Sequence, residues 1–390
     1  MRSLFMREDC YTLRGLCMTF IVLHHVFQYT AMQYAVHYPM LVAILMQSLG
    51  YLCTAVFFLL SGYGVHCSLA REQASCHTLS VGYVGSRLFR LLLPFLRLGL
   101  FTALLVLLCD VQRFGIGCEV PQSLTAVLSS LGSLSLPIGG NVWFFKVIIA
   151  LYLLTYLVSL FTSSAQRRIA LIALFVIGWI AFALYMGMGS NWYNSVLCFP
   201  LGMLCAHCRE ALTRLLTRRT LIVLSALLLL AYAGQTYGLS HYCLAAVKPW
   251  LTPCAMIACG LLFALLAVVV ASHITLRHPL LTFIGTNSLA FYLAQSCLLQ
   301  CYGVPSLALY LAVVLIGTPL LAWGIGKAPF ATRAERSHDK GRAFARQGQS
   351  VRTTRANGFQ PLSWPLFFPH HSTHFLCTRS PAYMATYSTF

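Results

Sequence analysis

Long apolar stretches separated by short polar segments run through the chain from about residue 12 to residue 324. A helix needs ~20 mostly apolar residues to cross a bilayer. Ten stretches have this character, at about 12–31, 40–65, 89–109, 142–161, 168–186, 192–208, 220–238, 250–271, 280–301 and 304–324. The stretch at 192–208 is the weakest, because it is short and contains Pro200 and Gly202. The pattern predicts an all-α, polytopic membrane bundle of about ten transmembrane helices.

Positive residues between the stretches predict the orientation of this bundle, because lysine and arginine collect in cytoplasmic loops. One set of alternating segments holds 14 of the lysines and arginines before residue 327, and the opposite set holds three, Arg113, Lys146 and Lys248. An error of one span would remove this bias. We therefore expect both termini in the cytoplasm, with the first stretch kept as an anchor in the plasma or inner membrane.

Composition excludes an ordinary soluble enzyme. Of the 390 residues, 59% are hydrophobic and 9% are charged, whereas soluble domains have about 25% charged residues. The net charge of +18 fits an anionic membrane surface, and the apolar fraction argues against a nucleic-acid partner. The 16 cysteines lie mostly in apolar runs, and Cys205 and Cys208 form a lone CxxC, so no metal site is expected.

The segment 327–390 differs from the membrane domain expected over 1–326. It holds nine lysines and arginines, two acids and no helical or strand period. One interpretation is a basic, disordered cytoplasmic tail that touches anionic lipid. The other is a reading-frame artefact, and the coding DNA would distinguish the two. No function is assigned to this segment.

The first span carries the most informative polar residues. Arg14 and His25 are eleven positions apart, so they share one helix face with a rise of ~16 Å between them. This spacing puts Arg14 at the cytoplasmic edge and His25 about halfway into the bilayer, while His24 points about 80° away from Arg14. Such a histidine either packs against another helix or serves as a base in a polar cavity.

Three later segments add candidate residues. Ser61 lies among small residues that favour close helix packing or ligand approach. Arg87 and Arg90 are neighbours on a helix and could clamp a phosphate or simply anchor the helix end. Tyr292 and Gln295 belong to a polar stripe that either bonds a neighbouring helix or faces a substrate. Arg97, two turns further in, should be functional or paired, and Lys146 should snorkel outward.

No predicted span interior contains aspartate or glutamate. Ion-coupled transporters commonly place carboxylates inside the bundle, so their absence weakens a transporter interpretation. The same absence leaves His25 without an orienting carboxylate. A carrier or exporter of a sugar or lipid-linked intermediate remains the alternative function, and a receptor or structural protein has no positive support.

Taken in order, these residues resemble the membrane-bound acyltransferase family 3 over about residues 8–324. The resemblance is carried by the Arg14 to His25 spacing, FFLLSGY at 57–63, RLFRLLLP at 87–94 and GTNSLAFYLAQ at 285–295, with VWFF at 142–145 as a fainter fifth feature. Family members often have a histidine where this chain has Gln295. Glutamine cannot transfer protons as histidine does, so hydrogen bonding to the acceptor is the role left for Gln295.

The resemblance implies an enzyme that moves an acyl group, expected to be acetyl, from acyl-coenzyme A to a hydroxyl of a carbohydrate or lipid-linked glycan in the cell envelope. It implies His25 as the catalytic base, and Arg14, Arg87 and Arg90 as residues that hold coenzyme A. His24, Ser61, Tyr292 and Gln295 are the candidates for substrate binding. No cofactor is expected to bind tightly, since the acyl-CoA is a co-substrate. Direct transfer and transient acylation of the histidine both remain open.

Overall fold

The computed structural model describes residues 7–75, 81–238, 248–274 and 277–326. Most of this part of the chain is helical, which confirms the all-α membrane bundle. The helices are α1 (Arg7–Gln33), α2 (Met40–Ser75), α3 (Val81–Leu108), η1 (Val111–Phe114), α4 (Leu124–Gly132), α5 (Trp143–Phe161), α6 (Ala165–Tyr185), η2 (Ser190–Trp192), α7 (Cys198–His207), α8 (Arg209–Leu215), α9 (Arg218–Ala233), η3 (Gly234–Gly238), α11 (Lys248–His273), α12 (Pro279–Thr286), α13 (Ser288–Leu298) and α14 (Leu307–Gly326). A two-residue antiparallel pair, β1 (Ser135–Leu136) and β2 (Gly140–Asn141), joins α4 to α5.

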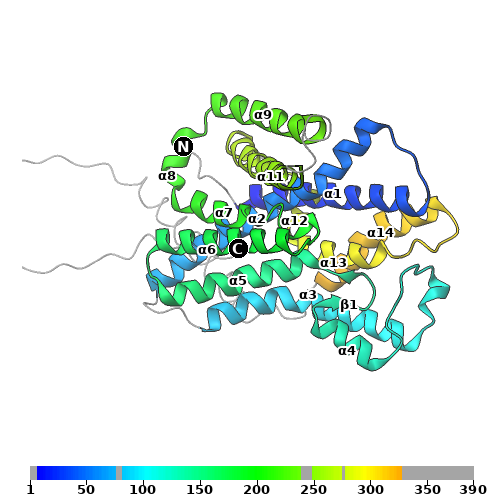
Figure 1. Cartoon of the computed structure of the whole chain (residues 1–390). Helices are drawn as coiled ribbons and strands as arrows, with labels where there is room; N and C mark the ends of the chain where they lie inside the picture. Colours follow the sequence, from blue (N-terminus) through cyan, green and yellow to red (C-terminus); the bar gives the residue numbers. More distant parts are fainter. Residues whose placement is uncertain (1–6, 76–80, 239–247, 275–276, 327–390) are drawn as a thin grey trace, which may run out of the picture. The chain divides into compact units, whose positions relative to one another are not determined.

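Eight of the described helices are long and apolar enough to cross a membrane: α1, α2, α3, α5, α6, α9, α11 and α14. They match eight of the ten predicted stretches. The orientation of the bundle stays a prediction, and the expected disordered tail at 327–390 lies outside the described residues. Figure 1 shows α3, α5 and α6 in succession, with α7 packed against α6 and α2 packed against α7.

The other two predicted spans are not continuous helices, and they contain the shorter apolar helices α7 and α13. The stretch at 192–208 begins in irregular chain and forms only the ten-residue α7, with Pro200 in its first turn, where a missing N–H costs no helical bond. The stretch at 280–301 breaks between α12 and α13. There the Nδ2 group of Asn287 donates to the carbonyl of Phe283 at 3.0 Å, which competes with the backbone hydrogen bonds of a continuous helix.

Glycines let two pairs of helices cross at backbone distance. A Cβ atom on Gly15 of α1 would lie 1.9 Å from the carbonyl oxygen of Leu281 in α12, and one on Gly285 would lie 1.8 Å from the carbonyl oxygen of Tyr11. The pair α2 and α7 meets in the same way through Gly62 and Gly202. Because no side chain fits there, each short helix is held tightly against a long one.

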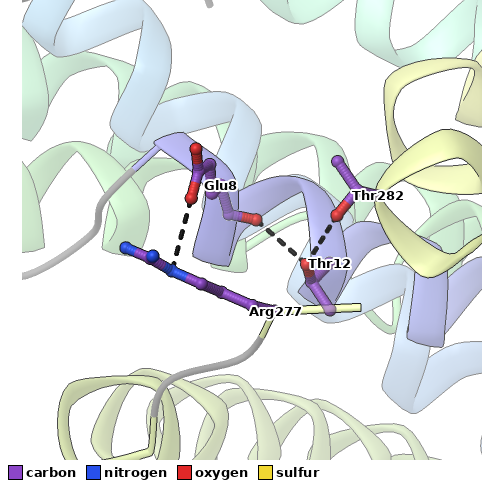
Figure 2. A network of polar contacts seen from close by, with 4 residues as sticks. All are labelled: Glu8, Thr12, Arg277 and Thr282. Atoms are coloured by element: carbon purple, nitrogen blue, oxygen red, sulfur yellow. Dashed lines mark hydrogen bonds and ion pairs between the residues drawn. The ribbon is translucent and has the colours of Figure 1, made fainter. Parts of the chain in front are cut away.

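Polar contacts reinforce the crossing of α1 and α12 (Figure 2). The hydroxyls of Thr12 and Thr282 lie 3.0 Å apart, and Thr12 also donates to the carbonyl of Glu8 at 3.1 Å. Arg277 Nε lies 3.3 Å from a carboxylate oxygen of Glu8. This network fixes the start of α1 relative to α12, and with it the position of Arg14 along the long axis of the bundle.

Two cations that the sequence places near the membrane have protein partners. Arg97 donates from Nη1 to the carbonyl of Ile325 at 2.9 Å, so this deep arginine is paired, as expected. Lys146 donates to Ser135 Oγ at 3.1 Å. β1 thus supplies an acceptor within reach of the ammonium group, and the outward snorkelling of Lys146 stays a prediction.

Candidate functional site

A cavity of about 670 Å³ lies inside the bundle. Its wall comes from α1, α2, α3, α5, α11, α12 and α13, together with the η2 turn and the residues that follow it. On α1 the lining residues follow helical spacing, at Arg14, Met18, Ile21, His25 and Gln28. One face of the first helix therefore borders the cavity over most of its length.

Three arginines gather at one end of this cavity, which we call the arginine end: Arg14, Arg87 and Arg90. The crossing of Gly15 over Leu281 brings Arg14 beside the α12–α13 break, where Gly285, Thr286 and Ser288 also line the wall. Arg87 lies over two tyrosine rings, 5.2 Å from the centroid of Tyr83 and 5.9 Å from that of Tyr152. Guanidinium groups arranged in this way are suited to phosphate oxygens.

Two histidines line the cavity further along α1, with ring centroids 4.9 Å apart. His24 is buried, and its Nδ1 lies 2.6 Å from the carbonyl oxygen of Met46. Because a carbonyl only accepts, Nδ1 carries the proton there. His24 also packs against Gly50, where a Cβ atom would lie 2.5 Å from Nε2. The ring of His24 is thus held in a single orientation by α2.

His25 has a different partner. Its Nδ1 lies 3.3 Å from Oε1 of Gln28, one helical turn further along α1. With the amide oxygen as acceptor, the Nδ1 proton is donated and Nε2 keeps its lone pair. Gln28 therefore does what an orienting carboxylate would do, and the ring of His25 is set up to accept a proton at Nε2.

Uncharged polar groups surround the histidines at the opposite end of the cavity, which we call the amide end. It is formed by Gln28, Gln47, Tyr51, Ser190, Asn191 and Asn194. The hydrogen bond of His24 to Met46 places Gln47, the next residue of α2, close to the histidines. Ser195 donates to the carbonyl of Tyr51 at 2.9 Å, and this contact places the residues that follow the η2 turn beside the same part of α2. These six residues therefore lie on the histidine side of the cavity.

Aromatic side chains form much of the wall between the two ends. Phe144 lies edge-on to Phe57 at 6.1 Å and to Tyr292 at 5.6 Å between ring centroids, and Trp143 contacts it at 6.0 Å. All four residues line the cavity. Interlocked rings of this kind make a stiff, largely apolar passage.

The structure brings seven of the eight residues predicted from the sequence to one cavity: Arg14, His24, His25, Ser61, Arg87, Arg90 and Tyr292. Both histidines reach it, although His24 is rotated away from Arg14, because the cavity covers a wide arc of α1. Gln295 is the exception, and its role in binding a substrate stays a prediction. It is 1% exposed, does not line the cavity, and its amide has no hydrogen-bond partner among the described residues.

Several residues of this region were not predicted. Gln28 could have been found, since it lies three positions after His25 on the same face. Gln47, Asn191 and Tyr152 carry no local signal, because long-range packing brings them to the cavity. Arg168, near the start of α6, is 2% exposed and donates to Ser159 and to Gln73.

The fold and this wall define a polytopic membrane protein with a polar internal cavity. A family model described as an acyltransferase domain matches residues 12–326. No curated protein and no solved structure matches the chain significantly. The chain belongs to acyltransferase family 3, as its motifs predicted, and it is a multi-pass membrane enzyme of the O-acyltransferase class.

Proposed function

We propose that the enzyme moves an acyl group, acetyl in the first instance, from acyl-coenzyme A to a hydroxyl of a carbohydrate or lipid-linked glycan of the cell envelope. The acyl-CoA is a co-substrate and not a resident cofactor, and the protein works in the plasma or inner membrane. The observation that carries the proposal is the shared cavity, in which three arginines lie at one end and an oriented histidine lies toward the other.

The arginine end suits the nucleotide part of the donor. Coenzyme A carries several phosphate groups, and Arg14, Arg87 and Arg90 offer guanidinium donors to them. Stacking on Tyr83 and Tyr152 restricts the directions that Arg87 can take. The long pantetheine arm would then run between the aromatic side chains toward the histidines, which brings the thioester to His25.

His25 acts as the general base in this proposal. Its Nε2 removes the proton from the acceptor hydroxyl while the hydroxyl oxygen attacks the thioester carbonyl carbon. Collapse of the tetrahedral intermediate forms the ester and breaks the carbon–sulfur bond, and the proton on His25 passes to the departing sulfur. The products are the acylated acceptor and free coenzyme A, and no other reactant is required. A positioned base contributes about 10²–10⁴-fold to such a rate.

Purified protein in lipid nanodiscs tests the function as a whole. The nanodiscs are incubated with [¹⁴C]acetyl-CoA and a panel of glycosides, and both the label on sugar and the free coenzyme A are measured. We expect the two to appear in equal amounts and only when the protein is present. Donor-independent movement of the glycoside across proteoliposomes, with no label on sugar, would instead support a carrier and contradict the proposal.

A further inference from the structure

We infer that the amide end of the cavity is the acceptor subsite and that it selects an uncharged, hydroxyl-rich acceptor over an acidic one. This inference rests on the proposed function, because it assigns the donor to the arginine end. It concerns four primary amides, Gln28, Gln47, Asn191 and Asn194, that line the same end of one cavity although they come from three separate segments of the chain.

Two of these amides are free to bind a ligand. Gln28 is engaged by His25, and Asn194 accepts a hydrogen bond from Ser195 Oγ at 2.9 Å. Within the part of the chain that the structure describes, no protein group hydrogen-bonds the side-chain amide of Gln47 or Asn191. Each amide offers two N–H donors and a carbonyl acceptor. A hydroxyl also donates and accepts, so such a pair complements neighbouring hydroxyls of a sugar ring.

The charge of the wall differs sharply between the two ends. All three arginines that line the cavity lie at the arginine end. Among the described lining residues, those of the amide end carry only amides and hydroxyls and surround the imidazoles of His24 and His25, with no acid, lysine or arginine. An acceptor carboxylate bound there would give up part of its water without gaining a counter-charge from the wall, and a partly desolvated charge without a partner is unfavourable. A neutral hydroxyl meets no such penalty.

The position of this end fits the proposed reaction. Gln28 contacts His25, and Met46, the neighbour of Gln47, accepts the hydrogen bond of His24. An acceptor held by Gln47 and Asn191 would therefore present a hydroxyl beside the histidines, while the donor approaches from the other end. Trp143 also lines the cavity and adds an aromatic side chain to the wall that the acceptor would meet.

The test compares octyl glycosides that differ in charge. The neutral probes are the octyl glycosides of glucose, galactose and N-acetylglucosamine, and the acidic probes are octyl glucuronide and octyl galacturonide. Initial rates of label transfer from [¹⁴C]acetyl-CoA are measured in nanodiscs. We expect kcat/KM for the best neutral probe to exceed that for either uronide by about 10-fold or more.

Charge-inserting variants then locate this preference in the wall. Asn191→Arg and Gln47→Arg should raise the acceptor KM for neutral probes about 5-fold or more and increase transfer to the uronides, with the donor KM within about 2-fold of the wild-type value. Gln122→Arg is the matched control, because Gln122 is exposed in a loop away from the cavity. Gln47 and Asn191 are not fully buried, so both variants should fold, which their melting temperatures will report.

The outcomes separate the two proposals. Equal transfer to neutral and acidic probes, or unchanged acceptor KM values in Asn191→Arg and Gln47→Arg, would overturn the acceptor subsite and leave the acyltransferase reaction in place. Absence of label on every glycoside would overturn the proposed carbohydrate acylation itself, and the inference with it.

Discussion

His25 and Gln28 lie one helical turn apart on α1, and Nδ1 of the histidine is 3.3 Å from the amide oxygen of Gln28. This single contact determines which ring nitrogen keeps its lone pair. It also orients the imidazole of His25 without a buried carboxylate, whose desolvation would be costly.

Removing the acceptor of this hydrogen bond should slow the reaction. In Gln28→Leu we expect kcat to fall about 10-fold, because the imidazole is no longer held in the productive tautomer. This loss corresponds to an activation free energy higher by about 1.4 kcal/mol, which is the contribution of about one hydrogen bond. The donor KM should stay within about 2-fold of the wild-type value. Steady-state kinetics with labelled acetyl-CoA measure both. Gln33→Leu, at the exposed end of the same helix, is the control, and an unchanged kcat in Gln28→Leu would remove Gln28 from the account.

Loss of a guanidinium group at the arginine end should weaken the binding of the acyl-CoA donor. For Arg87→Ala we expect the KM for acetyl-CoA to rise about 10- to 100-fold, because a hydrogen bond to a charged group contributes about 1.5–3 kcal/mol. Arg87→Lys should recover only part of this, since lysine loses the planar fork and the stacking on Tyr83 and Tyr152.

Arg167→Ala provides the control for this measurement. Arg167 is exposed at the start of α6 and does not line the cavity, so its loss removes a positive charge without touching the site. If Arg87→Ala and Arg167→Ala change the donor KM equally, the change comes from the lower net charge of the protein. The proposal that Arg87 binds a phosphate of coenzyme A is then refuted.

The glycine crossing of α1 and α12 should be sensitive to a single methyl group. In Gly15→Ala the new Cβ would lie 1.9 Å from the backbone oxygen of Leu281, so the two helices must separate. Overpacking of this kind costs about 1–3 kcal/mol or more, and we expect a lower melting temperature and displacement of Arg14. Gly178→Ala, in open space within α6, should keep or raise the melting temperature. A Gly15→Ala protein as stable as the Gly178→Ala protein would contradict the close crossing.

The ion pair at the start of α1 should contribute little by itself. Arg277 and Glu8 keep 55% and 62% of their side-chain surface exposed, and exposed pairs contribute about 0–1 kcal/mol. Arg277→Ala should therefore shift the melting temperature far less than Gly15→Ala does, and the shift should shrink further in high salt. A salt-independent loss as large as that of Gly15→Ala would show that the pair has a greater structural role.

Local sequence patterns predicted most of the fold because a membrane helix is defined by a long apolar run. They missed the breaks at 192–208 and 280–301, where hydropathy is high but Asn287 and the η2 turn interrupt the helix. For the site, Arg14 and His25 were predictable from spacing on one helix. Gln47 and Asn191 were not, because the contacts of His24 with Met46 and of Ser195 with Tyr51 that place them join distant parts of the sequence.

The central claim is that His25 is the base, and His25→Ala in nanodiscs with [¹⁴C]acetyl-CoA and the neutral octyl glycosides tests it most directly. His37→Ala serves as the control, since His37 is exposed beyond the end of α1. We predict that His25→Ala loses at least about 100-fold in label transfer while its melting temperature and its affinity for acetyl-CoA match those of His37→Ala. A folded His25→Ala protein that transfers label at the wild-type rate would contradict the account.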